Sequence, residues 1–362
     1  MKPIRILQVV PNMQQGGIEN LIMNIYRNID RNKVQFDFLV HYDKEFYFDR
    51  EIELLGGKIY HFPVMENKNI IKYYFELCKF FSEHREYKVV HGHMASLGFI
   101  YLGVAKKYGV KTRIAHSHGT SHLKNFKGYL KFLLFKLIKY KANVYWACST
   151  EAGKYLFPNR EFLFIPNAID LERFKYNEDI RKAVRKKLNI EGKFVVGNIG
   201  RFNLQKNHTF ILDIFSEILK KEKDSVLVLV GIGELEDDIK KKISNLKLEN
   251  NVMLLGNRND IEKIYQGIDM FLMPSIFEGL PLTGVEAQVS KLRCYFSDVI
   301  TKEVIVSNNV EFLPLKLCAK DWANKILIDR YYNRNDVKII NNEFDIKILA
   351  KKIEKTYIEY NQ

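Results

Sequence analysis

Two segments in the second half of the chain carry residue types that bind phosphates and sugar hydroxyls. Glu278 and Glu286 have seven residues between them in a stretch that follows an apolar run. A carboxylate of this kind accepts hydrogen bonds from the vicinal hydroxyls of a ribose or hexose. Arg201 and Lys206 follow another apolar run, and together they can clamp a diphosphate and neutralise charge on a leaving group. Either pair alone is commonly a solvated surface feature, so it is their combination that predicts a binding site.

Glycine-containing turns accompany these residues. The turn at Gly279 separates an expected strand ending at Met273 from an expected helix that begins near Leu282, and its backbone N–H groups would face a diphosphate. In the first half, Gly16 and Gly17 lie between a strand and a helix, where the missing side chains let the backbone approach a phosphate or sugar closely. A plain tight turn explains these two glycines equally well.

Four histidines form two His-x-His pairs, each at the end of an expected strand: His91 with His93, and His116 with His118. Residues two apart on a strand point the same way, so each pair could offer two metal ligands. No carboxylate or cysteine nearby completes such a site. We therefore predict no metal here.

The elements that must position these residues are strands alternating with helical segments, the pattern of βαβ units and a parallel sheet. The ligand site of a doubly wound sheet lies at the carboxyl ends of its strands. The expected strands of the first half are 4–10, 36–40, 58–62, 88–91, 113–116 and 144–147. Those of the second half are 194–199, 226–230, 252–255, 270–273 and 292–296.

The length of 362 residues predicts two domains, since one hydrophobic core rarely spans so long a chain. We place the first domain at residues 1–170 and the second at 171–340, with a charged linker stretch through Lys193. Residues 341–362 contain apolar positions at helical spacing, which predict an amphipathic helix crossing back to the first domain.

These motifs resemble those of the retaining family 4 glycosyltransferases, in order and in spacing. The resemblance covers most of the chain, and finer features such as the Arg113–His118 stretch look closest to bacterial enzymes of capsule and exopolysaccharide synthesis. Where the family has a glycine and a proline after the helix of Glu286, this chain has the sequence Ser-Lys-Leu-Arg-Cys at 290–294, which leaves the shape of that loop open. The segments that carry the resemblance are 16–17, 165–174, 200–208, 231–235, 256–258 and 278–287.

The resemblance implies a GT-B fold, in which two Rossmann-like domains face each other across a cleft. It implies a nucleoside-diphosphate sugar held by the second domain, transfer with retention, and no metal or other cofactor. Arg201 and Lys206 would hold the donor phosphates, Glu278 the donor sugar, and Glu286 the ribose.

Other positions acquire roles from the same resemblance. The amides of Gly279 and Leu280 would contact phosphate, and Asn257 and Arg258 would lie near the base. His118 matches the active-site histidine against the transferred sugar, with His116 as the competing match.

The charge distribution suggests an anionic partner. The net charge is +14, and residues 87–150 contain 11 Lys and Arg but no acidic residue. If this stretch is helical, Lys124, Lys127 and Lys131 form one stripe, which would suit an anionic membrane surface. A buried helix whose lysines extend to solvent is the alternative. Four scattered cysteines and the lack of a run of about 18 apolar residues favour a cytoplasmic protein, peripheral at the inner face of the membrane.

We therefore predict that the protein transfers a hexose from a nucleoside-diphosphate sugar to a lipid-linked carbohydrate acceptor. The expected donor is a UDP-sugar. The alternatives are a GT-B enzyme of other chemistry, such as an epimerase or phosphorylase-like enzyme, and a non-enzymatic anion-binding protein. The pI of about 9.3 raises nucleic acid as a partner. The sequence contains no recognition module for it, so we predict none.

Overall fold

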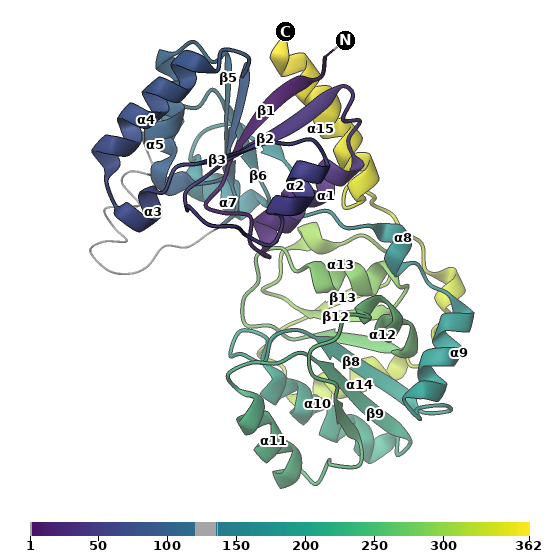
Figure 1. Cartoon of the computed structure of the whole chain (residues 1–362). Coiled ribbons are helices and arrows are strands. Elements are labelled where there is room, and N and C mark those ends of the chain that lie inside the picture. The colour runs from purple at the N-terminus through teal and green to yellow at the C-terminus, as the bar shows by residue number, and fades with distance from the viewer. Residues whose placement is uncertain (1, 120–134, 136) are drawn as a thin grey trace. The chain divides into compact units, whose positions relative to one another are not determined.

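The computed structural model describes residues 2–119, 135 and 137–362. The chain forms two compact units (Figure 1). Unit 1 comprises residues 1–169 together with 345–362, and unit 2 comprises residues 170–344. Each unit is a parallel sheet flanked by helices, which confirms the predicted α/β class with two Rossmann-like domains.

Unit 1 is built on a seven-stranded sheet with the order β3-β2-β1-β4-β5-β6-β7, and every pair of neighbours is parallel. Its strands are β1 (Ile4–Val9), β2 (Val34–Val40), β3 (Ile59–His61), β4 (Val89–Gly92), β5 (Thr112–Ser117), β6 (Val144–Ala147) and β7 (Leu163–Phe164). Its helices are α1 (Gly17–Asn28), α2 (Asp49–Leu54), α3 (Val64–Asn67), α4 (Ile70–Glu83), α5 (Ala95–Lys107), the 3-10 helix η1 (Ile138–Tyr140), α7 (Thr150–Leu156) and α15 (Ile346–Asn361).

The two faces of this sheet have separate cores. One core joins the sheet to α1 and to α15, whose residues Ile346, Leu349, Ala350, Ile353 and Tyr357 are buried as the helical spacing predicts. The other core joins the sheet to α4 and α5, which lie side by side (Figure 1). The last helix of the chain is therefore part of the fold of unit 1.

Unit 2 is built on a six-stranded parallel sheet with the order β10-β9-β8-β11-β12-β13. Its strands are β8 (Phe194–Ile199), β9 (Ser225–Val230), β10 (Val252–Leu254), β11 (Met270–Met273), β12 (Arg293–Ser297) and β13 (Val310–Leu313). Its helices are α8 (Leu171–Phe174), α9 (Glu178–Lys187), α10 (His208–Lys221), α11 (Glu236–Asn245), α12 (Ile261–Gly267), α13 (Leu282–Val289), α14 (Ala319–Ile328) and the 3-10 helices η2 (Lys302–Val304) and η3 (Arg334–Asp336).

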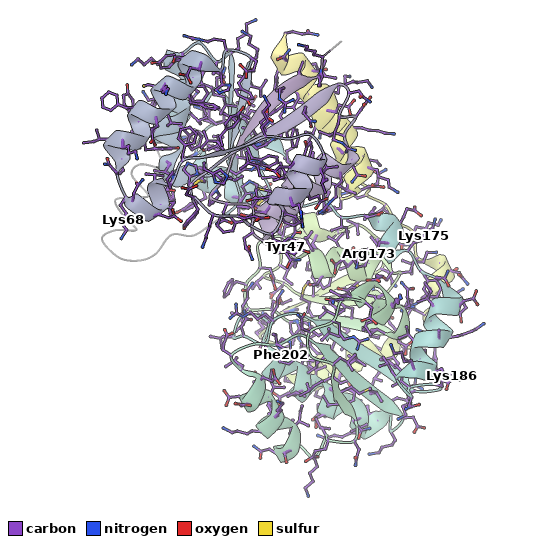
Figure 2. All side chains as sticks on the ribbon, viewed as in Figure 1. Tyr47, Lys68, Arg173, Lys175, Lys186 and Phe202 are labelled. Atoms are coloured by element: carbon purple, nitrogen blue, oxygen red, sulfur yellow. The ribbon has the colours of Figure 1, made fainter. Side chains whose placement is uncertain are left out.

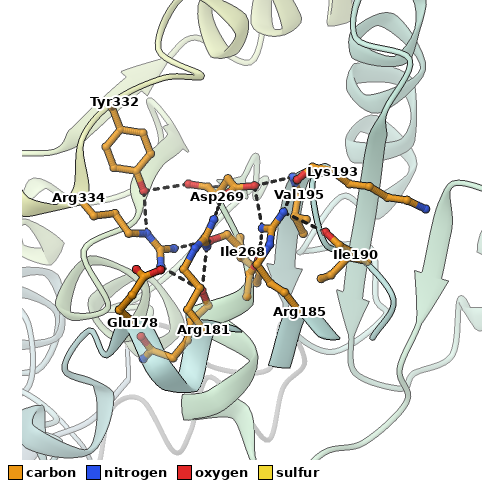
Figure 3. Close-up of polar contacts among 12 residues, drawn as sticks. Glu178, Arg181, Arg185, Ile190, Lys193, Val195, Ile268, Asp269, Tyr332 and Arg334 are labelled. Atoms are coloured by element: carbon orange, nitrogen blue, oxygen red, sulfur yellow. Dashed lines mark hydrogen bonds and ion pairs between the residues drawn. The ribbon is translucent and has the colours of Figure 1, made fainter. Parts of the chain in front are cut away.

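The charged stretch through Lys193 is not a linker, contrary to the prediction. It forms α9, which packs on α12 and binds the turn before β11 through an ion-pair cluster (Figure 3). Asp269 pairs there with Arg181 and, at 3.1 Å, with Arg185, and it also accepts a hydrogen bond from the backbone N–H of Val195 at 2.8 Å. The many charges of this stretch suggested a solvent-exposed linker, because Asp269, the carboxylate that pairs with its arginines, lies more than 80 residues away in the sequence.

Two short strands, β7 and β13, were not predicted, since neither carries a long apolar run. The other strand bounds differ from the predicted ones by at most two residues. The lysine stripe of Lys124, Lys127 and Lys131 lies outside the described residues. Among the residues that are described, no helix combines the length and the apolar character that crossing a bilayer requires.

Candidate functional site

Several predicted site residues follow the strands at which the strand order of each sheet reverses. In unit 1 this point lies between β1 and β4, and in unit 2 it lies between β8 and β11. Ligands of doubly wound sheets bind at such switch points, outside the carboxyl ends of the strands. Gly16 and Gly17 follow β1, Lys206 follows β8, and Glu278 follows β11.

Lys206 and Glu278 form the central contact of unit 2. The Nζ atom of Lys206 lies 2.6 Å from Oε1 of Glu278, and the Glu278 side chain is only 6 % exposed. The other carboxylate oxygen accepts a hydrogen bond of 3.0 Å from the side-chain amide of Gln205. A charged pair with so little solvent is worth more electrostatically than a surface pair, and it costs more to break. The pair brings together the two motifs that the sequence separates by more than 70 residues.

Backbone contacts hold the two loops in this position. The N–H of Ile276 donates to the carbonyl of Gln205 at 2.8 Å, and the side-chain amide of Asn207 donates to the carbonyl of Pro274 at 3.1 Å. Asn207 begins α10 in the left-handed conformation, with φ 56°, which asparagine tolerates better than most residues. The positions of Lys206 and Glu278 are therefore fixed by the loops as well as by their own contact.

A cavity of about 790 Å³ opens in unit 2, and its lining does not include Lys206 or Glu278 themselves. Gly200 is part of its wall, and a Cβ atom at Gly200 would lie 3.2 Å from Cε of Lys206, so the Lys206 side chain packs beside the cavity. Gly231 has φ 143°, and a Cβ there would lie 2.0 Å from the Gly200 carbonyl oxygen, so only glycine fits. The wall also contains Arg201, Asn257 and Arg258, three of the predicted site residues.

The two arginines of the cavity differ in how firmly neighbouring side chains hold their guanidinium groups. Arg201 is 71 % exposed in its side chain and contacts Glu234 at 3.1 Å, a weak surface pair. Arg258 makes two hydrogen bonds to Asp260, at 2.8 and 2.7 Å, which hold its guanidinium in place. Arg201 can therefore reorient toward an anion, whereas Arg258 is oriented already.

Glu286, on α13, accepts a hydrogen bond of 2.9 Å from the Tyr265 hydroxyl. Burial raises the pKa of the Glu286 carboxyl, and the hydrogen bond from Tyr265 lowers it in part. Neither Tyr265 nor Gln205 was among the predicted site residues. Gln205 could have been suspected, because it precedes Lys206 in the same loop; nothing in the sequence pointed to Tyr265.

The turn before α13 has the open backbone that the sequence predicted. Gly279 is exposed, and a Cβ atom added to it would have no neighbour within 4 Å. Pro281 precedes the first residue of α13, and no side chain caps this end of the helix. The N–H of Gly284 donates to the Pro281 carbonyl at 3.0 Å, so it is the N–H groups of Leu282 and Thr283 that can face a ligand. The roles of Gly279 and Leu280 as phosphate contacts stay predictions.

In unit 1 the four histidines gather into one hydrogen-bonded cluster with Gln8 and Tyr357. Nδ1 of His93 lies 2.9 Å from Nε2 of His118, and Nε2 of His93 lies 2.9 Å from the Gln8 amide oxygen. Nδ1 of His91 lies 2.6 Å from the Tyr357 hydroxyl, and its Nε2 lies 3.1 Å from Nδ1 of His116. Tyr357 belongs to α15, so the C-terminal helix reaches the candidate site of unit 1.

Burial lowers the pKa of every histidine in this cluster. The pKa of His118 falls to about 3, and those of His91, His93 and His116 lie well below the ordinary value of 6.5. All four are therefore neutral at pH 7. Ligand atoms of His91, His93 and His116 lie within 4.8 Å of one another, but both nitrogens of His91 and of His93 are already hydrogen-bonded.

His118 lines a cavity of about 270 Å³ in unit 1. Ile18, in the first turn of α1 directly after the Gly16–Gly17 pair, forms another part of the wall, so the start of α1 and His118 border the same cavity. His116 also reaches this wall, although its side chain is almost fully buried. Both candidate histidines thus remain, and His118 is the more accessible.

The glycine pair itself has ordinary backbone angles. Gly16 precedes α1 in an extended conformation that any residue can adopt, and no side chain caps the helix. A Cβ at Gly16 would lie 2.3 Å from a carboxylate oxygen of Glu19, whereas Gly17 has open space around it. The Glu19 side chain is flexible and can move aside, so neither position requires glycine on steric grounds.

Comparison with known proteins agrees with this arrangement. The family model described as "Glycosyltransferase Family 4" matches residues 15–173, and the model described as "Glycosyl transferases group 1" matches residues 180–333. Each match falls almost entirely within one structural unit.

Related proteins match across both units. The chain is 36 % identical over 312 residues to a protein of Bacillus subtilis named glycosyltransferase EpsF. The aligned region covers 83 % of this chain and 80 % of that relative. It is 29 % identical over 318 residues to the UDP-Gal:alpha-D-GlcNAc-diphosphoundecaprenol alpha-1,3-galactosyltransferase of Escherichia coli, over 82 % of this chain and 80 % of that one. The crystal structure of Anabaena HepE in complex with UDP has the same fold, with a TM-score of 0.73, 18 % identity, and coverage of 100 % and 98 %.

Proposed function

The chain belongs to the GT-B glycosyltransferases of family 4, and on that basis we propose that it transfers a hexose from a UDP-sugar to a carbohydrate acceptor. The observation that carries the proposal is the contact between Lys206 and Glu278. It joins the loop that we propose binds the diphosphate to the carboxylate that we propose binds sugar hydroxyls, and Lys206 packs near Gly200 in the wall of the 790 Å³ cavity.

In the proposed donor complex, Arg201 and Lys206 neutralise the diphosphate, and the N–H groups around Gly279 and Leu280 add hydrogen bonds to it. Glu286 accepts hydrogen bonds from the ribose, and Asn257 and Arg258 lie near the base. UDP is the first choice of nucleotide because two similar proteins carry it in their names, the Escherichia coli relative as UDP-Gal and HepE as its bound ligand.

The proposed reaction breaks the bond between the anomeric carbon and the diphosphate oxygen and forms a bond from that carbon to an acceptor hydroxyl oxygen. The hydroxyl proton leaves with the diphosphate, whose charge Arg201 and Lys206 stabilise as it develops. We propose retention at the anomeric carbon and no metal, since two cations on one loop can stabilise the leaving group. His118 contacts the transferred sugar as a neutral imidazole.

The proposed acceptor is a lipid-linked saccharide of capsule or exopolysaccharide synthesis. The Escherichia coli relative acts, by its name, on a sugar linked to diphosphoundecaprenol. We place the protein at the inner face of the cell membrane, where such a lipid acceptor would meet the nucleotide sugar.

The test is a donor screen. The purified protein is heated with UDP-, GDP-, ADP- and TDP-sugars in EDTA, and slow release of the sugar is followed in parallel. We expect UDP-sugars to raise the melting temperature and Glu286→Ala to abolish the rise. Glu236→Ala is the matched control, since it removes a carboxylate of unit 2 that has no proposed role. No response to any nucleotide sugar would contradict the proposal.

Retention needs its own measurement. The product formed from an α-linked donor is analysed by NMR, and an α anomer is expected. A β product would show inversion. Activity that appears only after a divalent cation is added back to the EDTA-treated protein would contradict the metal-independent mechanism.

A further inference from the structure

Helix α4 of unit 1 turns large apolar side chains toward solvent. Ile71 is 72 % exposed and Phe75 is 64 % exposed, and Ile70 and Tyr74 are also classed as exposed. The spacing of i, i+1, i+4 and i+5 places these four on one stripe of the helix. The adjacent stripe, with Leu77 and Phe80, is buried in the core of the unit. The apolar surface of α4 therefore extends beyond the stripe that the core covers, and the rest of it faces solvent.

Lysines surround this stripe. Lys107, at the end of α5, lies with its Nζ atom 3.3 Å from the Tyr74 hydroxyl and 5.6 Å from the centre of the Tyr74 ring. Lys72 on α4 is well exposed and reaches Glu76 at 3.6 Å. Lys68 ends α3 just before α4 and projects from the surface (Figure 2).

The same composition continues around α5. Tyr140, in η1, is 58 % exposed, and the Nζ atom of Lys139 lies 5.2 Å above its ring. η1 packs against α5, which packs against α4. The cations on α5 and η1 come from the stretch 87–150, which contains no acidic residue to offset them.

The chemistry of these side chains selects between a protein and a lipid surface. Protein interfaces are depleted in lysine at their centre, because an ammonium is costly to desolvate. At a bilayer surface, lysine stays hydrated beside the headgroups while aliphatic and aromatic side chains enter the boundary with the acyl chains. Lysines among exposed isoleucine, phenylalanine and tyrosine therefore match an anionic bilayer.

We propose that α4, with Lys107 of α5, is the surface on which unit 1 docks to an anionic lipid bilayer, and that Ile71 and Phe75 enter the headgroup region. The inference rests on the membrane association proposed above and assigns it to a particular surface. This surface is distinct from the predicted lysine stripe at Lys124, Lys127 and Lys131.

The test is flotation of the whole protein with vesicles of phosphatidylcholine, with and without phosphatidylglycerol. The double variant Ile71→Glu with Phe75→Glu is expected to lose binding to the anionic vesicles by roughly tenfold or more, because two apolar anchors are removed and two negative charges added. The matched control is Ile328→Glu with Tyr331→Glu in unit 2, whose residues are 75 % and 81 % exposed. We expect it to bind like the wild type.

Each result decides the matter. Unchanged binding of the α4 variant would overturn the assignment to α4 and leave membrane association to another segment. Absence of wild-type binding would overturn both, while the donor screen would still test glycosyl transfer on its own. A wild-type dimer that the α4 variant dissociates, without vesicle binding, would assign the surface to a second copy. If the double glutamate variant does not fold, Ile71→Ser with Phe75→Ser replaces it.

Discussion

The two units share one topology but build their candidate sites from opposite chemistry. At the switch point of unit 2, Lys206 and Glu278 are charged and paired, and Arg201 adds an exposed cation. At the switch point of unit 1, four histidines form a neutral hydrogen-bonded cluster. A cationic loop suits a diphosphate, whereas neutral imidazoles suit uncharged hydroxyl groups. The sheet provides the location in both units, and the loop residues decide which ligand fits.

The largest effect is expected from removing one member of the charged pair in unit 2. Lys206→Ala should lower sugar transfer by about 10²- to 10³-fold, the loss typical of removing one preorganised group that stabilises developing charge. Glu278→Gln should act in the same direction. The measurement is kcat/KM with the donor identified by the screen.

Lys240→Ala is the control for this variant, because Lys240 forms an ion pair of 2.7 Å with Glu236 on the exposed helix α11. It should change transfer little. Near-normal turnover of Lys206→Ala, in a protein that melts like the wild type, would remove Lys206 from the proposed mechanism.

As the pH falls, unit 1, which contains the neutral histidines, should lose stability before unit 2. Five described histidines of unit 1 have lowered pKa values, among them His41 at about 4 and His118 at about 3, whereas in unit 2 His208, at about 4, is the one described histidine with such a shift. Since the unfolded chain binds protons near pH 6.5 and the folded chain does not, stability is complete above that pH and falls below it. Each histidine contributes a slope of up to about 1.4 kcal/mol per pH unit.

The two tryptophans allow the units to be measured separately. Trp146 lies in unit 1 beside His91, and Trp322 lies in the core of unit 2. Urea unfolding at pH 7 and pH 5 can be followed by fluorescence in Trp322→Phe and Trp146→Phe, which leave one reporter each. We expect the unit 1 midpoint to fall further between the two pH values. An equal fall in both units would contradict the prediction.

A smaller effect should follow from Tyr357→Phe. This change removes the hydroxyl that contacts both Gln8 and His91, at 3.2 and 2.6 Å, and leaves buried polar groups without a partner. A loss of about 1–3 kcal/mol in the free energy of unfolding is expected, measured by urea titration. The UDP-sugar thermal shift should keep its size, because the proposed donor site belongs to unit 2. Tyr360→Phe on the same helix, outside the cluster, should leave stability near the wild-type value.

The smallest effect concerns Glu286. Like the residues of the unit 2 site it is ionisable, and like the histidines of unit 1 it is largely buried. Tyr265→Phe removes a hydrogen bond that lowers the Glu286 pKa, so that pKa should rise further. Because the proposed contact with the ribose uses the ionised carboxylate, the fall in nucleotide affinity on acidification should begin at a higher pH than in the wild type. Titration calorimetry across pH 5–8 measures this shift, and unchanged pH dependence would argue against a role for Glu286 in binding.

Much of the fold could be predicted from local sequence patterns. Strands such as Val144–Ala147 and Met270–Met273 carry compact apolar runs, and the buried face of α15 follows from helical spacing. Short or polar elements were missed. β13 has no continuous apolar run, and α9 reads as a solvated segment until Asp269 is placed beside its arginines.

The sequence by itself determined which residue types follow which strands: Arg201 and Lys206 after β8, Glu278 after β11, and His118 after β5. Only the tertiary structure decided which of them meet. It paired Lys206 with Glu278, added Gln205 and Tyr265, and joined the histidines to Tyr357 of the C-terminal helix. These contacts depend on strand order, and strand order is set by long-range packing that no local pattern records.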